Sequence, residues 1–170
     1  KERTISKLMH RQFEDELKDL KEQILRMGGH VEQAVEAATQ ALIQRQPTMF
    51  KLVHDLEAKI NREHMEVDES CLQLLARQSP LAADLRLVIA VLKISTDLER
   101  MGDQAVNIAE KALVINQMPP IKPYDDLPRM VEAAREMVRC ALHSFMARDV
   151  DEARKVLEMD DVVDRLNDQV

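Results

Sequence analysis

The fold is decided by the end of a long helical run, the stretch Asp97-Leu98-Glu99-Arg100-Met101-Gly102-Asp103-Gln104-Ala105-Val106-Asn107-Ile108-Ala109-Glu110. The pattern predicts one helix from Ser79 to Leu113, with two opposite stripes at about 100° per residue. One stripe is apolar throughout: Leu87, Val91, Ile94, Leu98, Met101, Ala105, Ile108 and Ala112. The other is apolar in its first half and oxygen-rich in its second: Leu85, Ile89, Leu92, Thr96, Glu99, Asp103, Asn107 and Glu110. We therefore expect the first half of the helix to be covered on both sides, and the acids to continue a partly covered face.

The composition favours an all-α protein. Only 2% of the 170 residues are aromatic and 3 are glycine, so Leu, Ile, Val, Met and Ala must fill the core. The formal charge of -7 argues against nucleic acid as a partner, because a phosphate backbone requires a basic face. The sequence shows no transmembrane run and no apolar signal core, so we expect a cytoplasmic protein.

Apolar periodicity and prolines predict the remaining elements. Helices are expected over about 6–44, 48–78 and 127–148, and from Val150 to the end. Three prolines within residues 119–123 forbid helix there and predict a linker. The predicted organisation is a three-helix repeat over 1–117, a Pro-rich linker over 118–124, and two helices of a second repeat over 125–170.

A constant offset of 103 residues relates the two parts of the chain without a gap. The matched positions are Ile24/Leu127, Met27/Met130, Val35/Val138, Ala38/Ala141, Leu42/Phe145, Arg45/Arg148, Val53/Val156, Asp55/Glu158, Leu56/Met159, Glu57/Asp160, Ile60/Val163, Asn61/Asp164 and Arg62/Arg165. Apolar periodicity alone would not as easily match the acidic and arginine positions. The third helix of the second unit would begin near position 185, so we expect an incomplete second bundle in this chain.

Oxygen-bearing side chains recur one helical turn apart and are candidate metal ligands. The candidates are Glu99, Asp103 and Asn107 in the third helix, Glu57 and Asn61 in the second, and Asp160 and Asp164 in the fifth. Such donors suit a hard or borderline cation, and facing helices of a bundle can complete its coordination. The alternative for each set is a solvated helix face.

The remaining chemistry-bearing residues give weaker signals. Cys71 and Cys140 are expected to be reduced, buried thiols of a cytoplasmic protein, with a disulfide or a catalytic cysteine as the alternative. The five histidines are scattered, and none forms the Glu-x-x-His pattern of di-iron bundles: His10, His30, His54, His64 and His143. We expect them to be ordinary surface or half-buried side chains.

Two motifs resemble the PhoU family of phosphate-signalling regulators. They are Ala76-Arg77-Gln78-Ser79-Pro80-Leu81-Ala82-Ala83-Asp84-Leu85-Arg86 and Asp97-Leu98-Glu99-Arg100-Met101-Gly102-Asp103, with upstream support from residues 27–32 and 67–71. The resemblance covers the whole chain and implies tandem three-helix bundles, in agreement with the repeat. It also implies metal binding by a Glu-x-x-x-Asp motif, which falls on Glu99 and Asp103. This sequence departs from the family in lacking the third helix of the second unit, and Asn61 stands where its repeat partner is acidic.

The resemblance implies a non-enzymatic negative regulator of phosphate uptake and phosphate-starvation signalling. It would link the ATPase subunit of a phosphate ABC transporter to the sensor histidine kinase of the phosphate regulon. It would act as a homodimer, peripheral to the membrane through its partners, and would bind divalent or iron-type metal ions such as Mg, Mn, Fe, Zn or Ni. From the residues alone, no Gly-rich phosphate loop and no nucleophile with an attendant base is evident.

Two other functions remain open on the sequence. A helical-bundle metalloenzyme of the di-iron type would need histidine ligands or four convergent carboxylates. A purely structural interaction module would use the acidic face to contact basic partners.

Overall fold

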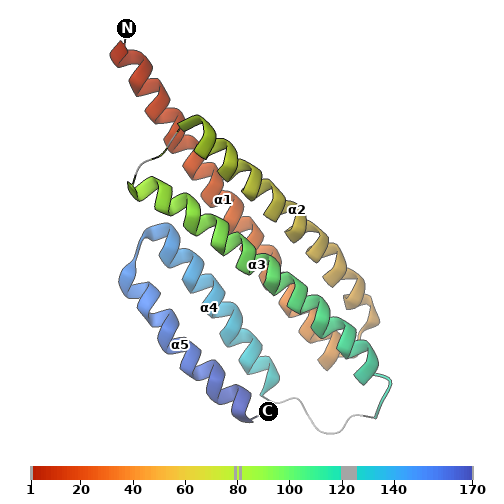
Figure 1. Ribbon diagram of the computed structural model, residues 1–170. Helices are drawn as coiled ribbons and strands as arrows, with labels where there is room; N and C mark the ends of the chain where they lie inside the picture. Colours follow the sequence, from red (N-terminus) through yellow and green to blue (C-terminus); the bar gives the residue numbers. More distant parts are fainter. Residues whose placement is uncertain (1, 79, 81, 120–125, 170) are drawn as a thin grey trace.

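The computed structural model describes residues 2–78, 80, 82–119 and 126–169, and this part of the chain contains five helices and no strand. The helices are α1 (Glu2–Ile43), α2 (Pro47–Gln78), α3 (Ala82–Ile115), α4 (Leu127–Ala147) and α5 (Val150–Gln169). Figure 1 shows α1, α2 and α3 as one long bundle, with α4 and α5 alongside it as a hairpin. The prediction of an all-α fold with an incomplete second bundle is therefore confirmed.

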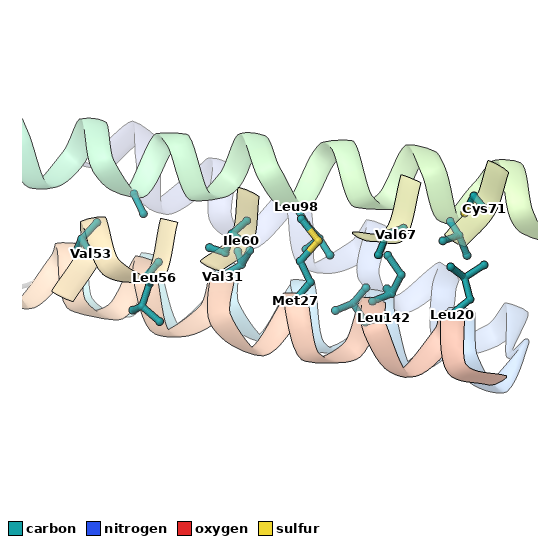
Figure 2. Packing of buried hydrophobic residues seen from close by; sticks show 14 of the residues in the cluster. Leu20, Met27, Val31, Val53, Leu56, Ile60, Val67, Cys71, Leu98 and Leu142 are labelled. Atoms are coloured by element: carbon teal, nitrogen blue, oxygen red, sulfur yellow. The ribbon is translucent and has the colours of Figure 1, made fainter. Parts of the chain in front are cut away.

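The main core lies between α1, α2 and α3, which pack against one another along most of their length. Its side chains are aliphatic or sulfur-containing, as the scarcity of aromatics required. Figure 2 shows the close packing of Leu20, Met27, Val31, Val53, Leu56, Ile60, Val67, Cys71, Leu98 and Leu142. Burial of this apolar surface is the dominant stabilising contribution to the bundle.

The α4–α5 hairpin joins the first bundle through contacts between α4 and α1. Leu142 on α4 is 7% exposed and belongs to the main hydrophobic cluster. A Cβ placed on Gly28 of α1 would overlap the Leu142 side chain, whereas a Cβ on Gly29 would meet nothing within 4 Å. Helix α1 continues through both glycines, so Gly28 provides close helix contact rather than a break.

The backbone supports the repeat predicted from the sequence. Helices α2 and α5 begin at Pro47 and Val150, which are 103 residues apart. The residues two positions earlier, Arg45 and Arg148, both adopt a left-handed conformation, with φ of 54° and 55°. Non-glycine residues rarely adopt this conformation, so its recurrence at the same offset marks two equivalent helix corners.

The predicted start of the third helix was wrong by a few residues. Pro80 is not helical, and α3 begins at Ala82, whose φ is 43°. Ser79, the expected first residue of this helix, lies outside the described residues, as do residues 120–124 of the expected linker, Asp125 and Val170. The division at 118–124 stays a prediction.

The prediction that the first half of α3 is covered on both sides was also wrong for the described chain. Leu85 and Ile89 on the second stripe are 37% and 42% exposed. The physical reason is that α3 packs against α1 and α2, while α4 packs against α1. The apolar half of this stripe therefore forms an exposed surface that leads into the acidic half.

Candidate functional site

The predicted ligands of α3 lie on its outward-facing side. Glu99 is half-buried, and Asp103 and Asn107 are exposed. The Asn107 amide group is 3.5 Å from Oε1 of Gln104, a contact within the same helix. The three side chains follow one another at single-turn intervals, so their oxygens are presented along one line of the helix surface.

The second predicted set, on α2, lies at the same level of the bundle. Ile60 of α2 packs against Gly102 of α3, where a Cβ on the glycine would lie 3.1 Å from Ile60 Cδ1. Gly102 thus brings α2 close to the turn that carries Glu99 and Asp103. The Nδ2 group of Asn61 donates a hydrogen bond to the Glu57 carboxylate.

One observation bears on whether these donors could hold a cation. The Oδ1 atom of Asn61 is buried and has no hydrogen-bond partner in the described part of the chain. An unpartnered amide oxygen next to a carboxylate is a suitable donor pair for a hard cation. The donor chemistry therefore fits a metal, although within residues 2–78, 80, 82–119 and 126–169 no three His, Cys, Asp or Glu side chains converge as a metal-binding group.

The third predicted set lies on α5. Asp160 and Asp164 are both exposed. Their neighbours Val156 and Val163 are only half-buried, whereas the repeat-equivalent Val53 and Ile60 are fully buried in the first bundle. The acids of α5 consequently stand beside a weakly covered apolar face and are not brought near those of α3.

A buried carboxylate that the sequence did not reveal connects α1 and α2. Glu63 is 7% exposed, and each of its oxygens is engaged by α1. Nε of Arg26 donates to Oε1 at 2.8 Å, and Nδ1 of His30 lies 2.8 Å from Oε2. Buried carboxylates require this kind of pairing, so the cluster holds α1 and α2 in register. The sequence signal that could have revealed this cluster is the position of Glu63 between Ile60 and Val67, on an otherwise apolar face of α2.

A second polar network joins α2 to α3, with one buried member, Ser95, and two half-buried members, His64 and Asp68. Nδ1 of His64 lies 2.8 Å from Oγ of Ser95, and Nε2 of His64 is 3.8 Å from Asp68. The residue types match a catalytic triad, but Ser95 is 0% exposed. A nucleophile must reach an acyl carbon, and this hydroxyl is enclosed by the bundle core. The arrangement is therefore a structural hydrogen-bond network.

Both cysteines are free in the structure; Cys71 is buried as expected, whereas Cys140 is half-buried, so the expected burial was wrong for Cys140, and the reduced state stays a prediction. Burial, with a smaller contribution from the charge of Asp68, raises the pKa of Cys71 to about 12. Burial and a hydrogen bond to Glu136 also raise the pKa of Cys140. Neither environment activates a thiolate, which argues against a catalytic cysteine.

The fold defines a class of all-helical, tandem-repeat proteins. The PhoU domain family matches residues 24–112 and 127–170, and the chain belongs to this family. No helix in the described part of the chain combines the length and apolarity needed to cross a membrane.

Similar proteins and structures agree with this assignment. A phosphate-specific transport system accessory protein PhoU homolog from Aquifex aeolicus is 38% identical over 155 residues, covering 91% of this chain and 70% of the relative. A homolog from Pseudomonas putida is 37% identical over the same length, and the match spans 60% of that relative. The crystal structure of PhoU from Pseudomonas aeruginosa superimposes with a TM-score of 0.86 at 35% identity, covering 92% of this chain and 76% of that one. The phosphate transport system regulatory protein PhoU from Streptococcus pneumoniae gives 0.81 at 28% identity, covering 91% and 72%.

Proposed function

We propose that this chain is a non-enzymatic accessory and regulatory protein of phosphate transport. Membership of the PhoU family and the names of its relatives support this role. The observation that carries the proposal is the outer stripe of α3, where exposed Leu85 and Ile89 lead into exposed Asp103 and Asn107. Exposed apolar side chains bordered by polar groups are characteristic of surfaces that bind other proteins.

The proposed partners are the ATPase subunit of a phosphate ABC transporter and the sensor histidine kinase of the phosphate regulon. The protein would hold the starvation response off by linking the two, as a cytoplasmic homodimer that reaches the membrane through its partners. A rod-like bundle with separate helix faces suits such an adaptor, because one face can bind each partner. The formal charge of -7 further favours partner surfaces of positive potential.

The acidic end of the α3 stripe is the proposed cation site. Glu99 and Asp103 would be the principal ligands, with Asn107 extending the set by one turn. Glu57 and Asn61 of α2, and Asp160 and Asp164 of α5, are proposed as secondary sites. A divalent or iron-type cation supplies positive charge and open coordination positions, which suits a bridge between this helix and an oxygen ligand, such as a backbone carbonyl, on a partner.

Metal content tests the cation site. Glu99→Ala/Asp103→Ala should lower the metal bound per chain, measured by elemental analysis after dialysis against a trace-metal mixture. The matched control is Asp55→Ala/Asp97→Ala, which removes two exposed acids outside the stripe. Equal metal content in wild type and both variants would rule out Glu99 and Asp103 as ligands.

A further inference from the structure

Two ion pairs join α1 and α4, and in both of them α1 supplies the acid and α4 supplies the arginine. Arg139 donates to Glu32 at 2.9 Å, and Arg135 lies 3.1 Å from Glu36. The side chains of Glu32 and Arg135 are only 17% and 20% exposed. Partly buried pairs are screened less than surface pairs, so their signs matter for the contact.

These pairs are related by the internal repeat. Moving Glu32 by the 103-residue offset gives Arg135, and moving Glu36 by the same offset gives Arg139. Each ion pair therefore becomes the other when the two units are exchanged. This reciprocity is the property of a two-fold interface, in which residue i contacts j and j contacts i. Helices α1 and α4 run antiparallel in Figure 1, which is the arrangement that a two-fold axis perpendicular to the helices produces.

The two units carry opposite charges at these equivalent positions, so the two-fold symmetry holds for position but not for charge. The first unit places only acids at the two positions, and the second places only arginines. If the same interface formed between two first units, Glu32 would face Glu36 of the other copy twice. Two second units would likewise oppose Arg135 and Arg139. Like charges at such positions disfavour the wrong pairing, while the observed pairing joins opposite charges.

We propose that the signs of these four charges determine which helix faces pair. The α1 face, which carries Glu32 and Glu36, binds the α4 face, which carries Arg135 and Arg139, of a second unit. The same charges exclude the α1 face of another copy. The pKa of the Arg139 guanidinium is raised by its hydrogen bond to Glu32 and by the charge of that residue, which is consistent with a favourable pair. Apart from α5, α1 is the only element that α4 packs against in the described chain. Loss of the pairs should therefore release α4.

Four double variants test the proposal, each keeping the net charge at -7. Two are crossed, Glu36→Arg/Arg139→Glu and Glu32→Arg/Arg135→Glu; they oppose like charges within the chain and create opposite charges between copies. Two are swapped, Glu32→Arg/Arg139→Glu and Glu36→Arg/Arg135→Glu; they create the same opposite charges between copies, but they reverse one ion pair and keep both attractions within the chain, so the α1 face stays covered. Each substitution occurs once in each set, so its local effects are balanced.

The measurements are hydrogen exchange of the α4 amides and the molar mass as a function of concentration. The crossed variants should lose protection in α4 by roughly tenfold or more and gain mass with concentration relative to wild type. The swapped variants should match wild type in both. Equal behaviour of the crossed and swapped sets in α4 protection and mass would overturn the proposal.

Discussion

Leu142 of α4 lies over Gly28 of α1 so closely that a Cβ on the glycine would overlap the leucine side chain. The next residue, Gly29, faces open space at the same point of the helix. Gly28 therefore permits the close contact between α1 and α4, whereas packing does not require a glycine at position 29. The close approach positions the ion pairs between α1 and α4.

Gly28→Ala and Gly29→Ala should change stability in opposite directions. The first forces the buried Leu142 side chain to move at a cost of about 1–3 kcal/mol, partly offset by up to about 1 kcal/mol of added helix propensity, so it should lower the free energy of unfolding by up to about 2 kcal/mol. The second adds helix propensity without a clash and should raise it by up to about 1 kcal/mol. Urea unfolding followed by circular dichroism measures both. Leu142→Ala should partly rescue the Gly28 variant, and destabilisation by Gly29→Ala of the same size would contradict the packing argument.

Loss of the buried carboxylate should weaken the α1–α2 contact. Glu63→Gln removes the charge that receives hydrogen bonds from Arg26 and faces His30, and should cost about 1.5–3 kcal/mol of unfolding free energy. Glu66→Gln is the matched control, because Glu66 is 61% exposed and lies 3.8 Å from Arg26. The control should change stability by less than about 1 kcal/mol. Equal effects of the two substitutions would show that burial of Glu63 contributes nothing specific.

The two thiols should differ in reactivity. A disulfide reagent at pH 8 should modify half-buried Cys140 before Cys71, which is 0% exposed and has its pKa raised to about 12. Modification of Cys71 should require unfolding, because only the exposed thiolate reacts. Mass spectrometry of a time course identifies the modified residue, and early labelling at Cys71 would contradict the buried position.

Cys71 should also contribute to the pH dependence of stability. Its pKa in the folded state, about 12, lies above the ordinary value of 9.0, so the folded state keeps the proton that the unfolded state loses. This contribution is present below pH 9 and is lost as the pH rises toward 12. Denaturant unfolding at pH 8, 9 and 10 should show a smaller decline for Cys71→Ala than for wild type. Identical declines would show that Cys71 does not titrate in this way.

The Ser95–His64 network should show no hydrolase character. A fluorophosphonate probe should leave Ser95 unlabelled in the folded protein, because the hydroxyl is enclosed by the core. Ser95→Ala should remove the hydrogen bond to His64 and cost about 1 kcal/mol of stability. Intact mass after incubation with the probe provides the measurement, and stoichiometric labelling would indicate an accessible nucleophile.

The sequence predicted those features that depend on local pattern. Helix periods and the proline-marked corner before Pro47 follow from short-range rules, and the 103-residue repeat follows from the similarity of two parts of the sequence. The left-handed residues Arg45 and Arg148 lie at that offset. Contacts between helices depend on how each helix is rotated about its axis and how it is shifted along its neighbour. The apolar pattern of a single helix does not determine either. The pattern of α3 required cover for Leu85 and Ile89, yet α4 packs against α1.

The candidate site could be predicted only as separate sets of oxygen-bearing side chains. Spacing placed Glu99 and Asp103 on one face, but the approach of α2 at Gly102 requires the three-dimensional packing of Ile60. The engagement of Glu63 by α1 likewise joins residues more than thirty positions apart. Such contacts follow from how the bundle is assembled, and no local motif in one helix specifies them.

The cation and partner functions of α3 should be coupled if the proposed function is right. Glu99→Ala/Asp103→Ala should weaken binding to the transporter ATPase subunit by roughly tenfold or more, as expected for loss of a cation bridge. Asp55→Ala/Asp97→Ala should retain the wild-type affinity. Equal losses for the two variants would assign the effect to net charge rather than to the stripe.

The most direct test of the proposed function is isothermal titration calorimetry of this chain against the ATPase subunit of a phosphate ABC transporter, with divalent cation present. We expect saturable binding that chelation by EDTA weakens. Absence of binding to the ATPase subunit by the folded, metal-replete chain would contradict it.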